Sequence, residues 1–301
     1  TIYVMSDVEM NQMAWVWEKE LTITSYGVDP VTLSRGENFH TNADPARQHY
    51  NPAMIEVGGE TEQGTVSSLI LTHIILDDMG KYEGEYFVQA DSEGDGETTV
   101  SRSEVPNTSI VQDAIIATYN GMGTITLGDG AELCNYGGMS AVRLSGGELI
   151  MEEGSAILDT TENEREKGAS GSFGPAGAVW LQGGILTMNG GTIGGDKGVM
   201  MNGRALYADG GTANIGGTIQ NIHGTDAAWQ GQNGVAVHLR SHGEATLAST
   251  GEITNVTGTN AGNNCAIWTQ FCNFTTKAGS KISHVDGFQL LYFDDLDNNN
   301  Y

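Results

Sequence analysis

Short apolar segments recur through the second half of the chain at steps of 24 to 37 residues. The marker position of each segment falls at Val142, Val179, Leu206, Val237, Ile267 and Leu291. Recurrence at this length is typical of solenoid proteins, in which each repeat packs only on its neighbours. The pattern therefore predicts stacked coils, not a layered globular fold.

Each repeat contains three short groups of apolar residues. In the repeat around Val179 they are Val179 with Leu181, then Leu186 with Met188, then Ile193 alone. Two-residue spacing points both members of a pair to the same side of a β-strand. The apolar groups are separated by dipeptides that favour sharp turns, namely Gly-Gly, Asn-Gly and Asp-Gly. Each repeat is thus expected to form three short strands, which make one coil of a triangular solenoid.

The first half follows the same pattern less regularly. Apolar segments begin at Ile2, Leu21, Met54, Leu69, Ile115 and Thr124. Together the segments predict an all-β fold, a single right-handed parallel β-helix solenoid of about nine coils with loops inserted at its corners. We expect one domain over residues 1–301, with less regular coils in 1–120, the clearest repeats in 121–293 and a long polar insertion at 79–109.

Composition supports this fold and excludes several functions. The chain contains 43 glycines, which disfavour helices. Its 38 acidic and 13 basic residues give a net charge of −25, which repels nucleic acids and anionic membranes. No apolar stretch is long enough for membrane insertion. The three cysteines match no zinc spacing and are expected to be free and buried, with Cys265 and Cys272 the only pair close enough to bond.

The repeats resemble those of the right-handed parallel β-helix, pectate-lyase-like superfamily. The segment GGILTMNGGTIGG, residues 183–195, resembles Gly-rich repeats in large surface proteins of Gram-positive bacteria. This resemblance implies an extracellular or cell-surface location and a larger parent polypeptide, and the start at Thr1 without a secretion signal suggests an excised fragment. The superfamily contains adhesins, polysaccharide lyases, glycoside hydrolases and phage tailspikes, so the fold alone does not determine function.

Strand alternation predicts two outward columns on one face. If Val179 and Leu181 point inward, Trp180 and Gln182 point outward. The equivalent residues form a first column of Arg143, Trp180, Tyr207, His238, Trp268 and Tyr292, and a second of Ser145, Gln182, Asp209, Arg240, Gln270 and Asp294. Aromatic rings beside polar groups suit a glycan ligand. Exposed aromatic side chains that lie together on a surface also indicate a binding site in general. The same columns could equally stabilise the sheet by cross-strand contacts or lie beneath corner loops.

The leading interpretation is a recognition or adhesin module that binds a poly- or oligosaccharide, or a host surface glycoprotein, through these columns. The first alternative is a glycoside hydrolase or polysaccharide lyase that uses Asp209, Asp226, His238 and Arg240 on the same face. Asp209 and Asp226 would then form the carboxylate pair, or His238 and Arg240 would serve a lyase as base and charge neutraliser. A further alternative is a structural stalk.

Two acidic segments partly match a calcium-binding loop. They contain Asp91, Glu93 and Asp95, and Asp295 and Asp297. Arg102 occupies the position where the first segment would need a bidentate carboxylate, and the second segment is cut short. Both segments are also explained as solvated acidic loops. Ca²⁺ is thus the one candidate cofactor, and no other is expected.

Overall fold

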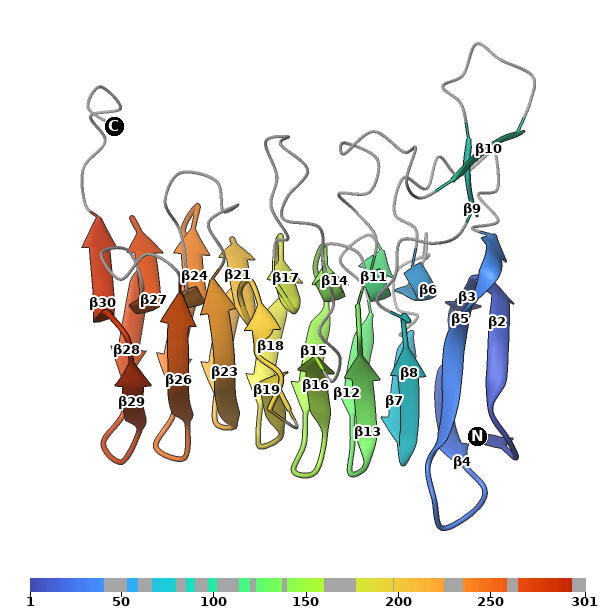
Figure 1. Ribbon diagram of the computed structural model, residues 1–301, viewed down its shortest axis with the longest axis horizontal. Coiled ribbons are helices and arrows are strands. Elements are labelled where there is room, and N and C mark those ends of the chain that lie inside the picture. Colours follow the sequence, from blue (N-terminus) through green and yellow to red (C-terminus); the bar gives the residue numbers. More distant parts are fainter. Residues whose placement is uncertain are drawn as a thin grey trace.

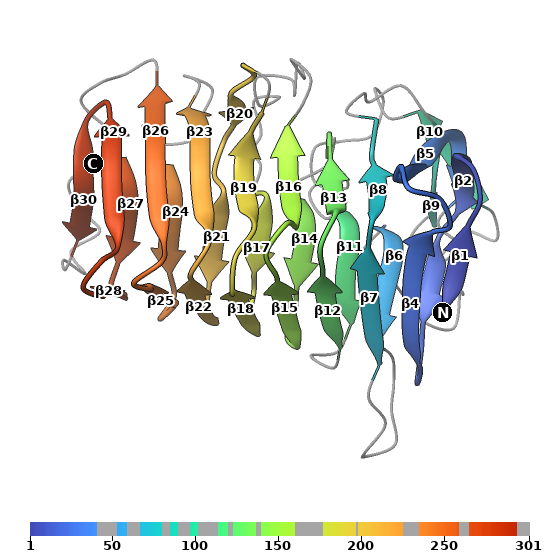
Figure 2. The ribbon, with the colours of Figure 1, turned by 90° about the horizontal axis from the view of Figure 1, so that it is seen from below.

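Three parallel sheets form the walls of a solenoid whose coils follow the chain from one end of the molecule to the other (Figures 1 and 2). The computed structural model describes residues 1–40, 53–58, 67–79, 85–89, 97–101, 114–119, 123–136, 140–159, 177–196, 198–224, 235–258 and 265–293. Within these ranges the structure contains β-strands and no helices. The all-β parallel solenoid expected from the repeats is confirmed.

Each coil contributes one strand to each sheet. Sheet 1 consists, in spatial order, of β1 (Ile2–Val4), β4 (Glu20–Ser25), β7 (Ser68–Thr72), β12 (Thr124–Leu127), β15 (Glu148–Met151), β18 (Ile185–Met188), β22 (Thr212–Ile215), β25 (Glu244–Leu247) and β28 (Asn273–Thr276). Sheet 2 consists of β2 (Val8–Gln12), β5 (Val31–His40), β8 (Ile74–Asp77), β13 (Ala131–Cys134), β16 (Ala156–Asp159), β19 (Thr192–Gly195), β23 (Thr218–Gly224), β26 (Glu252–Gly258) and β29 (Lys281–Val285), and β20 (Met201–Asn202) also pairs with β23.

Sheet 3 completes each coil. It consists of β3 (Ala14–Val16), β6 (Ala53–Gly58), β11 (Ala114–Tyr119), β14 (Ser140–Leu144), β17 (Val179–Leu181), β21 (Leu206–Asp209), β24 (Val235–Arg240), β27 (Cys265–Gln270) and β30 (Phe288–Phe293). The three sheets therefore define nine coils in the described part of the chain, as the sequence predicted. Figure 2 shows these coils side by side.

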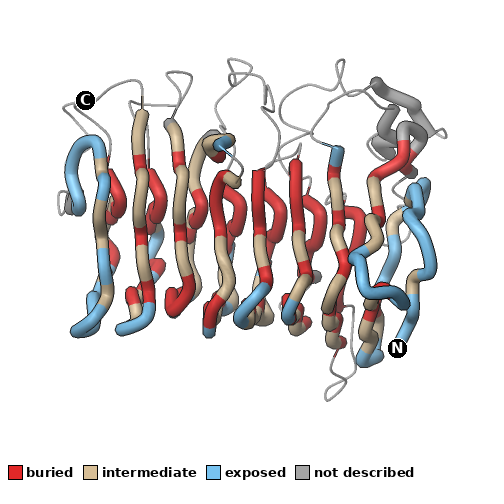
Figure 3. The backbone as a smooth tube through the Cα atoms, turned by 60° about the horizontal axis from the view of Figure 1, so that its bottom comes forward, coloured by how far each residue is buried: buried red, intermediate tan, exposed pale blue. Residues whose placement is uncertain are grey.

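The core is a set of inward columns that run through the coils. In sheet 1, for example, Met151 pairs with Met188 and Met188 with Ile215, and these side chains are at most 1 % exposed. Sheets 2 and 3 supply equivalent columns through Ile193 and Val179. Figure 3 shows this buried interior continuing along the middle coils. Burial of apolar area between successive coils is thus the main stabilising contribution.

Glycines at the corner between sheets 3 and 1 stack directly on one another. Gly147, Gly184 and Gly211 have φ values of 76°, 78° and 77°, in the left-handed region that most side chains avoid. A Cβ atom on Gly184 would lie 2.7 Å from the carbonyl oxygen of Gly147. The Gly-Gly dipeptides are therefore required both by the turn and by the close approach of neighbouring coils.

The first half departs from the sequence expectation in detail. The segment beginning at Leu69 forms two strands, because His73 adopts a left-handed φ of 49° and turns the chain between β7 and β8. Strands β2, β3 and β5 were not recognised from the sequence. Between β8 and β11 the structure describes β9 (Glu85–Gln89), which pairs antiparallel with β10 (Glu97–Ser101).

The three cysteines are free and buried, as predicted. Burial raises the pKa of the Cys265 thiol to about 12, so this thiol stays protonated at neutral pH. The Cys272 thiol donates to the carbonyl oxygen of Gln270 at 3.0 Å. These thiols act as small packing groups, not as reactive nucleophiles.

A buried ion pair interrupts the apolar interior near the first coils. Arg35 and Asp78 are 3 % and 0 % exposed at their side chains, and Arg35 Nε donates to Asp78 Oδ1. Arg35 also donates from Nη2 to the carbonyl oxygen of Ala114 at 3.0 Å, and its guanidinium lies 4.6 Å from the Phe39 ring centroid. The pair ties sheet 2 to sheet 3 across the interior.

We expect Arg35→Met to lower the free energy of unfolding by about 3–5 kcal/mol, because it leaves the Asp78 carboxylate buried without its cationic partner. The double variant Arg35→Met/Asp78→Leu removes both charges and should recover most of that loss. Denaturant unfolding of both variants measures the difference. A double variant no more stable than the single one would show that the pair itself is essential.

Candidate functional site

Five outward side chains on sheet 3 form a continuous stack, here called the ring stack: Arg143, Trp180, Tyr207, His238 and Trp268. Strand register places these residues opposite one another on successive coils, as the sequence predicted. The ring centroids of His238 and Trp268 lie 4.6 Å apart at an interplanar angle of 3°, and those of Tyr207 and His238 lie 5.0 Å apart. Trp180 extends the stack to Tyr207 at 6.4 Å.

Cationic side chains flank these rings. The Arg143 guanidinium carbon lies 5.3 Å from the centroid of the Trp180 ring, and that of Arg204 lies 5.3 Å from the Tyr207 ring. Burial lowers the pKa of Arg143 to about 10, an effect that nearby Glu56 partly opposes. Both arginines remain charged at neutral pH, since the pKa of Arg204 is also lowered only to about 10. The stack therefore combines π-faces with cations in a partly desolvated environment, where such contacts are strongest.

Solvent exposure of the ring stack differs from the sequence expectation. Arg143, Trp180 and His238 are 6 %, 8 % and 1 % exposed, whereas Tyr207 and Trp268 are half-buried. The prediction that these residues lie on the outer surface is wrong for the first three. Alternation sets the direction in which a side chain points, but it does not reveal what lies over the sheet.

His238 is the most enclosed member of the ring stack. Among the residues that the structure describes, neither its Nδ1 nor its Nε2 atom has a hydrogen-bond partner. Burial, together with the positive charges of Arg204 and Arg240, holds the pKa of His238 well below its usual value. The imidazole is therefore neutral at pH 7, and its ring serves as an aromatic plate between Tyr207 and Trp268.

The second outward column is more accessible and forms a polar strip of Ser145, Gln182, Asp209, Arg240 and Gln270. Ser145 and Gln182 are exposed, and the other three are half-buried. Register aligns Asp209 with Arg240 on adjacent coils. Arg143 Nε donates to Gln182 Oε1 at 2.8 Å, and Arg240 Nη1 donates to the Tyr207 hydroxyl oxygen at 3.3 Å. The ring stack thus orients parts of the polar strip.

The last coil does not follow the predicted alignment. Leu290, not Leu291, pairs with Ile267, so Leu291 pairs with Trp268 and Tyr292 pairs with Thr269. The assignment of Tyr292 to the ring column is therefore wrong by one residue, because Leu291 takes the position opposite Trp268. The assignment of Asp294 to the polar column fails with it, because Phe293 is the residue that pairs with Gln270; Asp294 itself lies outside the described residues.

The catalytic alternative receives little support from this face. Asp209, His238 and Arg240 lie near one another on β21 and β24, but His238 is enclosed and neutral. Among the outward residues described on sheet 3, the carboxylates are Glu56 and Asp209, four coils or about 19 Å apart. Glycosidases need two carboxyl groups within about 5–9.5 Å. Asp226, the proposed partner of Asp209, lies outside the described residues.

The calcium candidates Asp91, Glu93, Asp95, Asp295 and Asp297 also lie outside the described ranges. Elsewhere in the described chain, no group of three or more His, Cys, Asp or Glu side chains could hold a metal ion. A search of the same residues for helices long and apolar enough to cross a membrane finds none.

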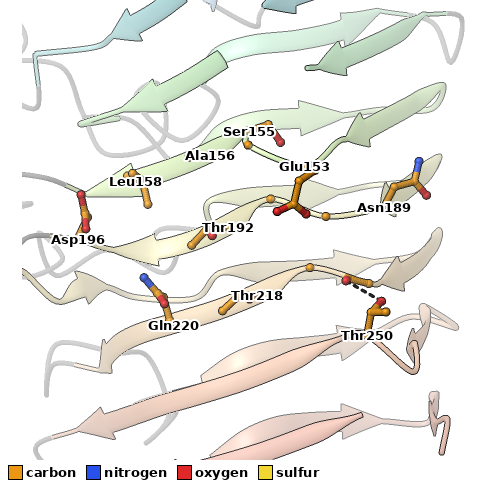
Figure 4. A pocket seen from close by; sticks show the side chains of 15 residues that line it. Glu153, Ser155, Ala156, Leu158, Asn189, Thr192, Asp196, Thr218, Gln220 and Thr250 are labelled. Atoms are coloured by element: carbon orange, nitrogen blue, oxygen red, sulfur yellow. Dashed lines mark hydrogen bonds between the residues drawn. The ribbon is translucent and has the colours of Figure 1, made fainter. Parts of the chain in front are cut away.

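A polar groove of about 510 Å³ on sheet 2 was not anticipated from the sequence (Figure 4). It crosses the turns that connect sheet 1 to sheet 2 and continues over β16, β19 and β23. Its lining includes Glu153, Asn189, Asp196, Gln220 and Thr250. The sequence signal for this groove was the recurring Gly-Gly-Thr-Ile motif, at residues 190–193 and again at 216–219. The glycines of both copies line the floor of the groove.

The floor of the groove needs glycine for steric reasons. A Cβ atom on Gly217 would lie 2.3 Å from the carbonyl oxygen of Gly190. The described lining residues of the groove supply mostly hydroxyl, amide and carboxylate groups, with Ala156 and Leu158 among them, and none of them is aromatic. It therefore offers hydrogen bonds but no apolar plate, which distinguishes it from the face of sheet 3.

No protein-family model matches this chain, and comparisons with curated proteins and with solved structures also find no match. What is established is accordingly the architecture: an all-β parallel solenoid consistent with a parallel β-helix.

Protonation of His238 should destabilise the fold. The folded-state pKa lies below the unfolded value of about 6.5, so the unfolded chain binds more protons as the pH falls below that value. The stability contributed by neutral His238 is therefore present at pH 7.5 and decreases below about pH 6.5, by up to about 1.4 kcal/mol per pH unit. The variant His238→Phe keeps a ring and should lack this component.

Denaturant unfolding of the parent and His238→Phe between pH 7.5 and pH 5 measures the effect. The exposed last-coil variant His284→Phe serves as the control and should retain the parent's pH dependence. Equal pH slopes for the parent and His238→Phe would show that the imidazole is not enclosed in the folded protein.

Proposed function

We propose that this chain is an extracellular recognition module of a bacterial surface protein and that it binds an oligosaccharide along the outward face of sheet 3. The observation that carries this proposal is the pairing of an accessible polar strip with a ring stack that fixes its geometry. Polar side chains recur once per coil in the strip, and half-buried Tyr207 and Trp268 lie beside them.

Positioning of the strip supports ligand binding. Gln182 is exposed yet accepts a hydrogen bond from buried Arg143, and Arg240 is held against the hydroxyl of Tyr207. Side chains ordered before binding lose less conformational entropy when a ligand arrives. Amide, carboxylate and guanidinium groups then satisfy sugar hydroxyls, while an aromatic face covers the apolar side of a sugar ring.

Charge narrows the class of glycan. The net charge of −25 opposes the approach of polyanionic polysaccharides over a Debye length of about 8 Å. A neutral oligosaccharide avoids this repulsion and still meets donors and acceptors along the strip. We therefore propose neutral glycans, free or on a glycoprotein, as the ligand class.

Binding to an array of neutral oligosaccharides, followed by titration of the best one, tests the proposal. We expect Gln182→Ala and Asp209→Ala each to weaken binding by about 1–3 kcal/mol, the usual effect of truncating an interface anchor, with little change in melting temperature. Trp180→Ala should instead lower stability, because its ring is buried.

Matched variants in the groove of sheet 2 provide the control. Asn189→Ala and Gln220→Ala remove polar groups of similar size far from the polar strip and should leave affinity unchanged. Loss of binding in the groove variants alone would move the ligand to sheet 2 and overturn the proposed site. Absence of binding across the array would overturn the glycan proposal itself, and new reaction products would favour the hydrolase or lyase alternative.

A further inference from the structure

Hydrogen bonds within sheet 3 fix which atoms the polar strip presents to a ligand. Arg143 Nε donates to Gln182 Oε1 at 2.8 Å. A guanidinium has donors and no acceptor, so this contact places the carboxamide oxygen of Gln182 on the Arg143 side and leaves its Nε2 hydrogens unused. Gln182 is exposed, whereas Arg143 is buried. The group that Gln182 offers to a ligand is therefore a hydrogen-bond donor.

The positive charge of Arg143 strengthens this donor. With a pKa of about 10, Arg143 is charged at neutral pH. A hydrogen bond from a charged group is stronger than one between neutral groups, and it polarises the amide that accepts it. The guanidinium is itself held beside the Trp180 ring, 5.3 Å from its centroid. Gln182 Nε2 is thus an ordered donor that favours a strong acceptor, such as a carbonyl oxygen.

Asp209 supplies the opposite chemistry on the next coil. Leu181 pairs with Ala208, so Gln182 and Asp209 occupy equivalent positions one strand spacing, about 4.8 Å, apart. Arg240 follows Asp209 in the register, but its Nη1 atom donates to the Tyr207 hydroxyl oxygen at 3.3 Å. No ion pair that includes Asp209 occurs among the described residues. The Asp209 carboxylate is therefore left as an acceptor beside the donor of Gln182.

Ser145 presents an acceptor on the other side of Gln182. Its hydroxyl donates to the carbonyl oxygen of Thr118 at 2.9 Å, and its backbone N–H donates to Thr118 Oγ1 at 3.2 Å. With its hydrogen used in this way, the Ser145 hydroxyl can only accept from a ligand. Three successive coils of the strip thus offer an acceptor, a donor and an acceptor.

A secondary amide matches this order. Its carbonyl oxygen only accepts and its N–H only donates, whereas a hydroxyl group does both and needs no fixed order. One amide can therefore satisfy the donor of Gln182 and the acceptor of Asp209 together. Among neutral sugars, the N-acetylated hexosamines carry such a group as an acetamido substituent.

Tyr207 offers an apolar surface for the methyl end of an acetamido group. It lies on the same strand as Asp209 and is half-buried. Its ring is held between Trp180 and His238, with centroid distances of 6.4 and 5.0 Å. A fixed aromatic ring of this kind provides contact area without further ordering. A hexose with a hydroxyl in place of the acetamido group cannot make this contact.

We propose that the polar strip recognises the acetamido group of N-acetylated hexosamines. Gln182 Nε2 donates to the carbonyl oxygen of this group, Asp209 accepts from its N–H, and Tyr207 contacts its methyl group. This specificity rests on the proposed glycan-binding function of the same face and names its ligand class. N-acetylated hexosamines are neutral, so they avoid the repulsion that a net charge of −25 imposes on acidic sugars.

Titrations with two matched pairs of methyl glycosides test the proposal. The pairs are N-acetylglucosamine against glucose and N-acetylgalactosamine against galactose. The members of each pair are neutral and differ only in an acetamido or a hydroxyl group at one carbon. We expect at least one acetylated sugar to bind at least tenfold more tightly than its hexose, because only the acetylated sugar satisfies the fixed donor and acceptor together.

The variant Gln182→Glu isolates the contribution of the donor. It keeps an oxygen that accepts from Arg143 but replaces Nε2 with a second acceptor, which repels the carbonyl oxygen of the ligand. We expect the affinity ratio within a pair to fall toward one, while the melting temperature stays unchanged because the side chain is exposed. The matched control Gln220→Glu makes the same chemical change in the groove of sheet 2 and should keep the parent's ratio.

Hexoses that bind as tightly as both acetylated sugars would overturn the acetamido site and leave the proposed glycan-binding function standing. Absence of binding by all four glycosides overturns the acetamido site as well, and the array of neutral oligosaccharides then decides the broader function separately. A Gln182→Glu protein that keeps the tenfold preference contradicts the assignment of the donor to Gln182.

Discussion

Successive coils can pack only if every residue at a given position lies one strand spacing, about 4.8 Å, above its counterpart. This constraint determines most of the sequence. Inward positions must be apolar and similar in size, as in the column through Met151, Met188 and Ile215, because each side chain fills the space left by the next. Corners must be small, because Gly184 approaches the carbonyl oxygen of Gly147 too closely for a Cβ atom.

The same spacing gives the outward face of sheet 3 its organisation. Side chains separated by one strand spacing are close enough for their rings to stack. His238 and Trp268 stack in this way, with nearly parallel rings whose centroids are 4.6 Å apart. A neutral imidazole can stack between two aromatic rings, which explains why an enclosed histidine is tolerated there although its ring nitrogens have no hydrogen-bond partner in the described part of the chain. The accessible polar strip then takes its geometry from a stack that is itself mostly hidden, so recognition and stability are coupled on this face.

The sequence predicted the fold well wherever repeats carried two apolar pairs and a Gly-Gly corner. It failed at the last coil, because the consecutive leucines Leu290 and Leu291 fit the alternation equally well in either phase. It also missed the strand at Val8–Gln12, since solvent-exposed end strands lack a clear alternating pattern. Alternation correctly placed His238 in a column, but burial depends on contacts far along the chain that no local pattern encodes.

Distances between spin labels along sheet 1 test the coil-by-coil stacking most directly. A label at Glu20→Cys is paired with one at Ile185→Cys, Glu244→Cys or Asn273→Cys, all exposed and equivalent in register, while the native thiols are buried. Four, six and seven strand spacings predict distances of about 19, 29 and 34 Å by pulsed dipolar spectroscopy. Distances that fail to increase in this order and by this step would contradict the stacked solenoid.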